Sequence, residues 1–218
     1  MQPSWVDLQL RRRGLTDARI LAAMESVPRE LFVPARARRY AYDDAALELG
    51  CGQTISQPYI VALICASLGL AGGERVLDVG TGSGYQAAVL AELAGSAISV
   101  ERIPALAEQA RRNLDAAGYA ARVEVVVGDG TLGLPARAPF DAIAVAAAAR
   151  EIPAALEDQL APSGRLVIPI GESLVCVERT AGGERCVRLL APARFVPLVA
   201  GVFPPAGEFT RHAARLSR

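Results

Sequence analysis

A glycine-rich turn between an apolar run and a helical pattern constrains this chain more than any other feature. Residues 76–79 are apolar apart from Asp78, Gly80-Thr81-Gly82-Ser83-Gly84 follows directly, and a helix is predicted from Tyr85. Glycines let the backbone turn sharply and approach a ligand closely. Glu101 ends a second apolar run about twenty residues later, where a carboxylate can hold both ribose hydroxyls. We therefore predict a nucleoside-cofactor site.

The charge of Asp78 distinguishes between two classes of nucleoside cofactor. Residues 82–87 satisfy the relaxed dinucleotide pattern, but a dinucleotide brings an anionic pyrophosphate to the helix N-terminus, where a carboxylate would repel it. S-adenosylmethionine (SAM) instead carries a sulfonium, an ammonium group and no phosphate. With no lysine or arginine adjacent, Asp78 favours SAM. A dinucleotide, or a turn that only packs a helix on a strand, are the alternatives.

Composition indicates one domain with a large core and no nucleic-acid partner. The length of 218 residues fits a single domain, and 52% hydrophobic residues can bury a sizeable core. The formal net charge is zero. The arginines of residues 11–13 and 36–39 are interpreted as solvated helix faces rather than phosphate contacts.

Targeting signals and metal-binding spacings are not expected. Residues 1–5 lack a cationic region followed by an apolar one, and the apolar stretch 60–71 is too short to span a bilayer. The cysteines have no paired short spacing, which argues against zinc and against a disulfide framework; they are Cys51, Cys65, Cys176 and Cys186. We expect reduced thiols in the cytoplasm, no membrane contact and no metal, and we assume a monomer.

From residue 73 onward, apolar runs alternate with helical patterns, as in a parallel sheet covered on both faces. The expected strands are 75–79, 97–100, 123–127, 141–145 and 165–170, and the expected helices are 85–93, 104–117 and 153–160. Two further β-like runs, 174–179 and 184–190, flank Thr180-Ala181-Gly182-Gly183 and predict a hairpin. The expected fold class is α/β, a Rossmann-like doubly wound sheet, mostly parallel with antiparallel C-terminal strands.

The first seventy residues do not alternate and predict an N-terminal helical elaboration. Helices are expected at 5–13, 17–26 and 58–68, with Thr16 as the N-cap of the second. The polar, glycine-flanked segment 50–59 is expected to be a loop beside the nucleoside site. One domain, 1–218, would thus comprise helices and an active-site loop (1–70), the SAM-binding sheet (71–200) and a C-terminal tail (201–218).

Three carboxylates fall at or just beyond the ends of successive expected strands: Asp78, Glu101 and Asp129. In an open α/β sheet the ligand crevice lies outside the carboxyl ends of the strands. Each acid alone could be a helix cap or a solvated loop residue. Their shared position favours one binding site.

Several motifs together resemble the protein-L-isoaspartate (D-aspartate) O-methyltransferase family. The glycine turn would fit any SAM-dependent methyltransferase, whereas Gly52-Gln53-Thr54-Ile55-Ser56-Gln57-Pro58 resembles the family's signature active-site loop. The other matching segments are Val27-Pro28-Arg29, Phe32-Val33-Pro34, Tyr42-Asp43-Asp44, Gly128-Asp129-Gly130, Phe140-Asp141-Ala142-Ile143, Gln159-Leu160, residues 164–171 and Phe195-Val196-Pro197-Leu198.

The resemblance implies an enzyme that transfers the SAM methyl group to the free carboxylate of L-isoaspartyl or D-aspartyl residues in damaged proteins or peptides. The methyl ester then cyclises to a succinimide, part of which reopens to normal aspartate. The residues implied for the methionine end of SAM are Asp78, Gly80, Thr81, Gly82 and Gly84. Those implied elsewhere are Glu101 at the ribose, Asp129 and Gly130 by the adenine, Thr54, Ile55 and Ser56 between cofactor and substrate, and Gln53, Gln57 and Pro58 at the substrate.

Chemistry independently fits a carboxylate acceptor. A carboxylate with a pKa of about 4 is ionised at neutral pH, so its methylation needs no general base. The chain has one histidine, His212, in a polar tail where a solvated role is expected. The site must instead align oxygen, methyl carbon and sulfur. Ser56 is the predicted catalytic residue, donating a hydrogen bond to the acceptor; a helix N-cap is its alternative role.

Because this chain departs from the family pattern at several positions, other substrates and functions are kept as alternatives. Cys51 replaces a polar residue, residues 46–49 read Ala-Leu-Glu-Leu, residues 146–150 lose a threonine and a proline, and the tail after Leu198 matches poorly. The alternatives are a divergent member that methylates an aspartate of a dedicated peptide or another small nucleophile, and, from another class, a NAD-dependent oxidoreductase or a nucleotide sensor.

Overall fold

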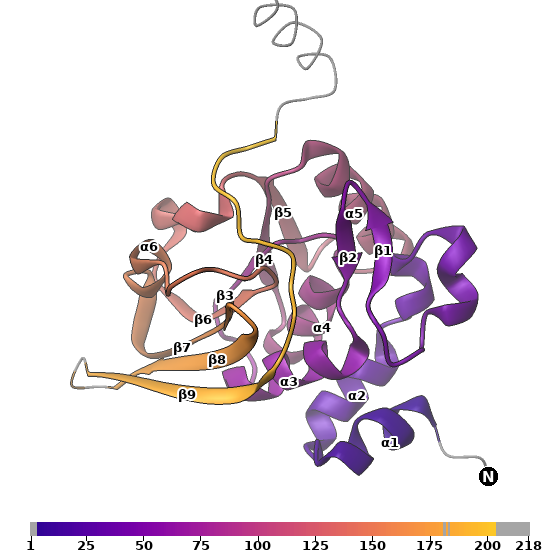
Figure 1. The fold of residues 1–218 in the computed structure, drawn as a ribbon, viewed down its shortest axis with the longest axis horizontal. Helices are drawn as coiled ribbons and strands as arrows, with labels where there is room; N and C mark the ends of the chain where they lie inside the picture. The colour runs from indigo at the N-terminus through magenta and orange to yellow at the C-terminus, as the bar shows by residue number, and fades with distance from the viewer. Residues whose placement is uncertain (1–3, 181, 183, 204–218) are drawn as a thin grey trace, which may run out of the picture.

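The structure, a computed structural model, describes residues 4–180, 182 and 184–203 and centres on one seven-stranded sheet (Figure 1). The strand order is β5-β4-β3-β6-β7-β8-β9. Pairing is parallel from β5 to β7 and antiparallel for β8 and β9. The strands are β3 (Val76–Val79), β4 (Ala97–Glu101), β5 (Val123–Val127), β6 (Phe140–Val145), β7 (Leu160–Ile170), β8 (Ser173–Arg179) and β9 (Arg185–Pro192). This arrangement confirms the predicted fold class. Residues 181 and 183 of the expected hairpin turn lie outside the described residues.

Helices supply the connections between the parallel strands and the N-terminal elaboration. The α-helices are α1 (Trp5–Gln9), α2 (Ala18–Ser26), α3 (Pro58–Leu68), α4 (Tyr85–Ala94), α5 (Pro104–Ala116) and α6 (Ala154–Glu157). Short 3-10 turns are η1 (Arg11–Arg13), η2 (Arg29–Phe32), η3 (Ala35–Tyr40), η4 (Gly130–Leu132) and η5 (Pro135–Arg137).

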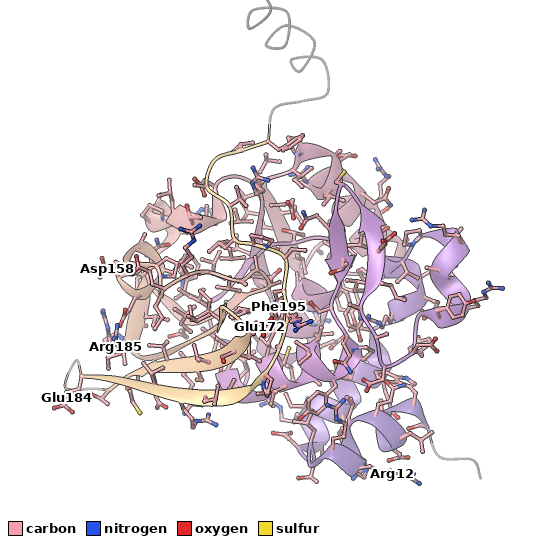
Figure 2. All side chains as sticks on the ribbon, in the orientation of Figure 1. Arg12, Asp158, Glu172, Glu184, Arg185 and Phe195 are labelled. Atoms are coloured by element: carbon pink, nitrogen blue, oxygen red, sulfur yellow. The ribbon has the colours of Figure 1, made fainter. Side chains whose placement is uncertain are left out.

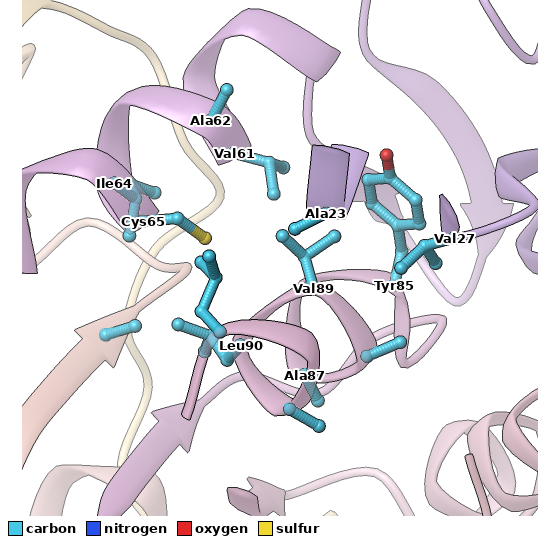
Figure 3. Packing of buried hydrophobic residues seen from close by; sticks show 14 of the residues in the cluster. Ala23, Val27, Val61, Ala62, Ile64, Cys65, Tyr85, Ala87, Val89 and Leu90 are labelled. Atoms are coloured by element: carbon cyan, nitrogen blue, oxygen red, sulfur yellow. The ribbon is translucent and has the colours of Figure 1, made fainter. Parts of the chain in front are cut away.

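Alternation along the central strands sends side chains into two cores, one on each face of the sheet. Val76 packs with α3 and α4, whereas the next residue, Leu77, packs with Leu156 of α6. On the first face, Figure 3 shows Val61 of α3 facing Val89 of α4. A sheet buried on both faces has near-continuous apolar strands, so each polar residue inside one stands out.

Two N-terminal predictions were wrong in detail. The expected helix 5–13 divides at Leu10 into α1 and η1. Asp17, not Thr16, is the N-cap of α2, because its carboxylate accepts from the backbone N–H of Arg19 at 2.8 Å. The ionised carboxylate of Asp17 satisfies the first-turn donors and also interacts favourably with the helix dipole.

The expected helix 153–160 is only the single turn α6. β7 already begins at Leu160, which pairs with Phe140, and the backbone N–H of Phe140 donates to Gln159 O at 2.8 Å. Gln159 and Leu160 therefore pair with β6 instead of extending the helix, because tertiary context overrides the local helical preference.

The segment expected as a loop, residues 50–59, contains the turn and the second strand of a small antiparallel hairpin, β1 (Leu47–Gly50) and β2 (Gln53–Ile55). Its turn is Gly50-Cys51-Gly52, and all three residues have positive φ. The two strands are not paired with the central sheet. The hairpin therefore stands beside the sheet and leads directly into α3, as Figure 1 shows.

After β9 the chain turns back across the carboxyl ends of the parallel strands (Figure 1). The backbone N–H of Ala148 donates to Val196 O and that of Leu198 donates to Ala148 O, each at 2.8 Å. Further along, the N–H of Phe203 donates to Arg102 O at 2.8 Å. We call residues 195–203 the C-terminal strap. It closes over the edge of the sheet where the predicted site lies.

Candidate active site

A cavity opens at the carboxyl ends of β3, β4 and β6, and we call it the first cavity. It lies between the hairpin on one side and the strap on the other. Its lining includes Gln53, Thr54, Ile55, Ser56, Gly80, Thr81, Gly82, Ser83, Tyr85, Gln86, Glu101, Arg102, Ile103, Gly130, Ala146 and residues 196–199. The topology thus brings the N-terminal loop, the glycine turn and the ends of three strands together.

The glycine turn forms one wall of the first cavity. Gly80 and Gly82 have φ of +94° and +54°, a region that L side chains rarely adopt. A Cβ on Gly80 would contact Ala146, and one on Gly82 would contact Leu49 of the hairpin, each at 3.6 Å. Gly84 has a different role: it does not line the cavity, and a Cβ there would lie 3.1 Å from Leu114 of α5. The sequence placed Gly84 at the cofactor, whereas the structure uses it to pack α4 against α5.

Glu101 lies in the first cavity, 5% exposed, at the end of β4. Its Oε2 accepts from the N–H of Gly82 and its Oε1 from the N–H of Ile103, both at 2.9 Å. These bonds connect the acidic residue to the glycine turn and fix its orientation. The remaining lone pairs are acceptors for a diol at the cavity wall.

Asp78 lies one layer below the cavity and does not line it, in contrast to the sequence prediction. The carboxylate is fully buried, and its oxygens accept from Gln86 Nε2 at 2.8 Å and from Ser99 Oγ at 2.6 Å. Thr81 Oγ1 completes the chain, 2.6 Å from Ser99 Oγ. Burial raises the pKa of Asp78 to about 6, and Glu101 adds to the rise, while the bonds from Ser99 and Gln86 oppose it. Asp78 is therefore connected to the cavity by hydrogen bonds, directly to the lining residue Gln86 and through Ser99 to the lining residue Thr81.

Gln86 is a cavity residue that the sequence analysis missed. Its Nε2 is committed to Asp78, and its buried Oε1 has no hydrogen-bond donor in the described part of the chain. An orphaned acceptor above a buried carboxylate suits a ligand that carries donors and positive charge. Among the described lining residues, the one cation is Arg102, whose Nε donates to Gly201 O at 3.1 Å. These residues fit the methionine end of SAM better than a pyrophosphate.

Asp129 fixes the strap, while its neighbour Gly130 lines the cavity. Asp129 Oδ1 accepts from the N–H of Thr131 at 2.9 Å, and Oδ2 accepts from the N–H of Gly201 at 2.6 Å. Although burial raises the pKa of Asp129, the hydrogen bond from the Thr131 hydroxyl, the two backbone hydrogen bonds and the charge of Arg102 outweigh it, so the net direction is downward. A Cβ on Gly130 would lie 2.6 Å from Val79 Cγ1, so the backbone must approach β3 closely there.

A second cavity adjoins the first, and four residues line both: Thr54, Ser56, Ala146 and Val196. The second cavity also includes Asp44, Gln57 and Glu172, and Figure 2 shows Glu172 beside Phe195 of the strap. Ser56 Oγ has no hydrogen-bond partner among the described residues. Its hydroxyl is therefore available to a ligand at the junction of the two cavities.

The remaining loop residues divide between the cavities. Gln53 lines the first cavity rather than the substrate side where the sequence placed it, while Gln57 lines the second and donates to Asp44 O at 3.0 Å. Pro58 is the buried first residue of α3 and lines neither. The N-cap of α3 is Gln57 without a side-chain bond, so Ser56 is not the cap.

Sequence reasoning missed residues that become functional only by contact. Ser99 pairs in register with Asp78, and a polar residue inside each of two neighbouring apolar runs was the available signal. Val196 and Val199 enter the cavity because the strap folds back, which no local pattern predicts. Among the described residues, no helix is long and apolar enough to cross a membrane, and no metal-binding cluster occurs.

The family model that matches this chain and two of its relatives carry the same description. The model of the family described as protein-L-isoaspartate(D-aspartate) O-methyltransferase (PCMT) matches residues 5–202. The chain is 55% identical over 199 residues to protein-L-isoaspartate O-methyltransferase 2 of Marinobacter nauticus, covering 89% of this chain and 90% of that protein. It is 52% identical over 207 residues to the protein-L-isoaspartate O-methyltransferase of Methanoculleus marisnigri, covering 93% of each.

A solved structure extends the similarity to three dimensions. The beta-aspartate methyltransferase (PCMT) from Plasmodium falciparum, in complex with S-adenosyl-L-homocysteine, superimposes with a TM-score of 0.77 at 27% identity. The match covers 91% of this chain and 99% of that one.

Proposed function

Because this chain belongs to the protein-L-isoaspartate(D-aspartate) O-methyltransferase family, we propose that its two joined cavities divide the reaction between them. The chain is a SAM-dependent enzyme that methylates the free carboxylate of L-isoaspartyl and D-aspartyl residues in damaged proteins, which initiates their repair. In our proposal SAM occupies the first cavity and the acceptor carboxylate enters the second. The observation that carries this division is that Thr54 and Ser56 line both cavities.

The first cavity would hold SAM by its ends and its ribose. Glu101 binds the ribose hydroxyls, and Gly130 lies at the adenine. Gly80, Gly82 and Gln86 surround the methionine end, and the buried charge of Asp78 favours the cationic groups there. Asp78 and Gly84 do not line the cavity. Asp78 contributes through its negative charge, and Gly84 through the close packing of α4 against α5.

The acceptor needs orientation rather than deprotonation. Bound SAM supplies an electrophilic methyl group. Ser56 Oγ donates a hydrogen bond to one acceptor oxygen and so directs the other toward that methyl, while Thr54 and Ile55 separate the cofactor from solvent. The hairpin and the strap exclude water from a transfer in which opposite charges cancel, and a dry site favours that step. Gln57, on the second cavity, faces the peptide that carries the acceptor.

The setting of the enzyme is proposed on simpler grounds. Each of the four cysteines is free in the structure, which suits a reducing cytoplasm. Isoaspartyl proteins and peptides are the partners, with no membrane or nucleic acid required. We also propose that the chain is one domain and acts as a monomer.

Radiolabelled SAM tests the acceptor directly. The protein is incubated with matched peptides that differ only in an isoaspartyl or a normal aspartyl linkage. We expect base-labile methyl ester on the isoaspartyl peptide alone. Label on the aspartyl peptide would instead show methylation without isoaspartyl specificity, and binding of SAM with label on neither peptide would indicate a dedicated peptide substrate or a sensor.

Ser56→Ala tests the catalytic assignment. Loss of one oriented hydrogen bond, worth about 1.4–4 kcal/mol in the transition state, should lower kcat by roughly ten- to a thousandfold. Calorimetric affinity for S-adenosylhomocysteine should stay near that of the wild type. Ser67→Ala on α3, which lines neither cavity, is the matched control. Wild-type turnover in Ser56→Ala would remove Ser56 from the mechanism.

A further inference from the structure

Arg29, the first residue of η2, carries a fully buried guanidinium. Its Nε donates to Ala41 O and its Nη2 donates to Ser56 O, each at 2.7 Å. The guanidinium carbon lies 4.6 Å from the centre of the Tyr85 ring, and Nη1 has no hydrogen-bond partner in the described part of the chain. The cation is therefore held entirely by neutral groups.

A buried cation without a carboxylate partner is costly, because its hydration is lost and no opposite charge replaces it. Burial lowers the pKa of Arg29, although an arginine remains protonated. Arg19 makes a useful contrast: it also donates to two backbone carbonyls, Leu70 O and Leu93 O, but from an exposed position. Structural bridging alone can thus be achieved at the surface. The burial of Arg29 indicates a more demanding role.

Two of the three groups around Arg29, the Ser56 carbonyl and the Tyr85 ring, belong to residues that line the site, whereas Ala41 lines neither cavity. Ser56 lies at the junction of the cavities, and Tyr85 begins α4 directly after the glycine turn and lines the first cavity. On the other side of Ser56, Gln57 O accepts from the N–H groups of Ile60 and Val61 at the start of α3. Arg29 and α3 therefore hold two consecutive carbonyl groups, those of Ser56 and Gln57, and fix the backbone that carries the Ser56 hydroxyl.

We propose that Arg29 is a positioning residue for methyl transfer. Its planar fork fixes Ser56 relative to Tyr85 and the glycine turn, so that the Ser56 hydroxyl meets the acceptor carboxylate in the aligned geometry. This inference rests on the role proposed above for Ser56. This positioning depends on the direction of the guanidinium hydrogen bonds and not only on the positive charge. Lysine cannot reproduce the planar fork of donors.

The test uses Arg29→Lys and Arg29→Gln in the full chain, each alone and combined with Ser56→Ala. Misplacing a reacting group by about 1 Å costs up to roughly a hundredfold, so we expect kcat of the single Arg29 variants to fall by about 10- to 100-fold. Affinity for S-adenosylhomocysteine should be essentially unchanged. Since Arg29 acts through Ser56, the double variants should be no slower than Ser56→Ala alone.

Controls separate positioning from folding. Arg19→Lys removes a comparable bridge away from the cavities and should lower the melting temperature without lowering kcat. Each Arg29 variant is compared with it at matched folded fraction, judged by near-UV circular dichroism and cofactor binding. Hydrogen exchange over residues 53–58 should accelerate in both Arg29 variants and not in Arg19→Lys; unchanged exchange there would overturn the proposal even if one variant folded poorly.

Two kinetic outcomes would also overturn it, and they differ from failure of the proposed function. Wild-type kcat in Arg29→Lys, or losses that multiply in the double variants, would show that Arg29 does not act through Ser56. Wild-type kcat in Ser56→Ala would instead contradict the role proposed for Ser56 itself, and the inference about Arg29 would fall with it.

Discussion

At the scale of single residues, Glu101 must satisfy the protein and the cofactor with one carboxylate. Each oxygen already accepts one backbone N–H, from Gly82 and from Ile103. A carboxylate has about four lone-pair sites and can accept further bonds, whereas an amide in its place offers a single acceptor oxygen. The residue therefore shapes the glycine turn and presents an acceptor to the ribose at the same time.

Glu101→Gln should weaken SAM binding by about 1–3 kcal/mol, the range for loss of a charge-assisted hydrogen bond. The amide NH₂ would also face a backbone donor, so part of the loss comes from the turn itself. Calorimetry with SAM measures the change, and Glu108→Gln on the exposed face of α5 is the control. An unaltered dissociation constant would exclude Glu101 from the cofactor site.

Asp78 should make SAM binding depend on pH. Its pKa in the free protein is about 6, against about 3.9 for an unfolded aspartate. The folded state therefore binds the proton more tightly. The contribution of protonated Asp78 to folding stability is fully present below pH 4 and is lost as pH rises toward 6. A cationic ligand favours the ionised carboxyl, so affinity should move in the opposite direction and increase through the same range.

We expect the dissociation constant for SAM to rise by up to about tenfold between pH 7.5 and pH 5, one unit below the pKa of Asp78. Asp78→Asn should bind SAM more weakly at pH 7.5 and lose this dependence, with its fold intact by circular dichroism. Calorimetry across the pH range distinguishes the two proteins. The same pH profile in Asp78→Asn would show that another group titrates.

At the scale of elements, the hairpin β1–β2 is the part best suited to move. It pairs only with itself, through three register pairs, and an isolated two-stranded hairpin is marginally stable. Leu49 lies near Gly82, so the hairpin rests on the glycine turn without a continuous ladder to the sheet. These features predict a lid that closes on bound cofactor and peptide.

Hydrogen exchange measures this closure. Amide exchange over residues 47–57 should slow when S-adenosylhomocysteine and an isoaspartyl peptide are both bound, because the hairpin then spends less time open. Residues 175–179 of β8 and 185–189 of β9, which lie at the far edge of the sheet and line neither cavity, are the internal control and should exchange at the same rate in both states. Equal exchange of residues 47–57 in free and bound protein would contradict a lid.

At the scale of the whole molecule, the chain contains a single histidine, and the reaction should not need it. His212 lies outside the residues that the structure describes. With both substrates saturating, kcat of the wild type should be flat between about pH 6 and 8, where a histidine base would titrate. His212→Ala should give the same profile. A limb in that range that disappears in His212→Ala would indicate a neutral acceptor that must lose a proton.

The sequence predicted those features that depend on local pattern. Apolar periodicity identified the parallel strands and the C-terminal antiparallel pair, and spacing placed Glu101 one strand after the glycine turn. The family resemblance selected the segment around Ser56. Such features can be predicted because each strand and turn depends on the residue types within a few consecutive positions.

Tertiary structure decided what depends on contact between distant segments. The helical pattern of residues 153–160 was overridden by pairing with β6, and the first part of the polar loop 50–59 forms the turn and second strand of the hairpin β1–β2. Asp78 was placed below the cavity by Gln86 and Ser99, and Gly84 against Leu114. Burial, pKa and the partners of Arg29 are properties of packing, and packing joins residues that no local pattern relates. Local pattern therefore specifies the type of reaction that this chain can carry out, whereas folding specifies which atoms line the site of that reaction.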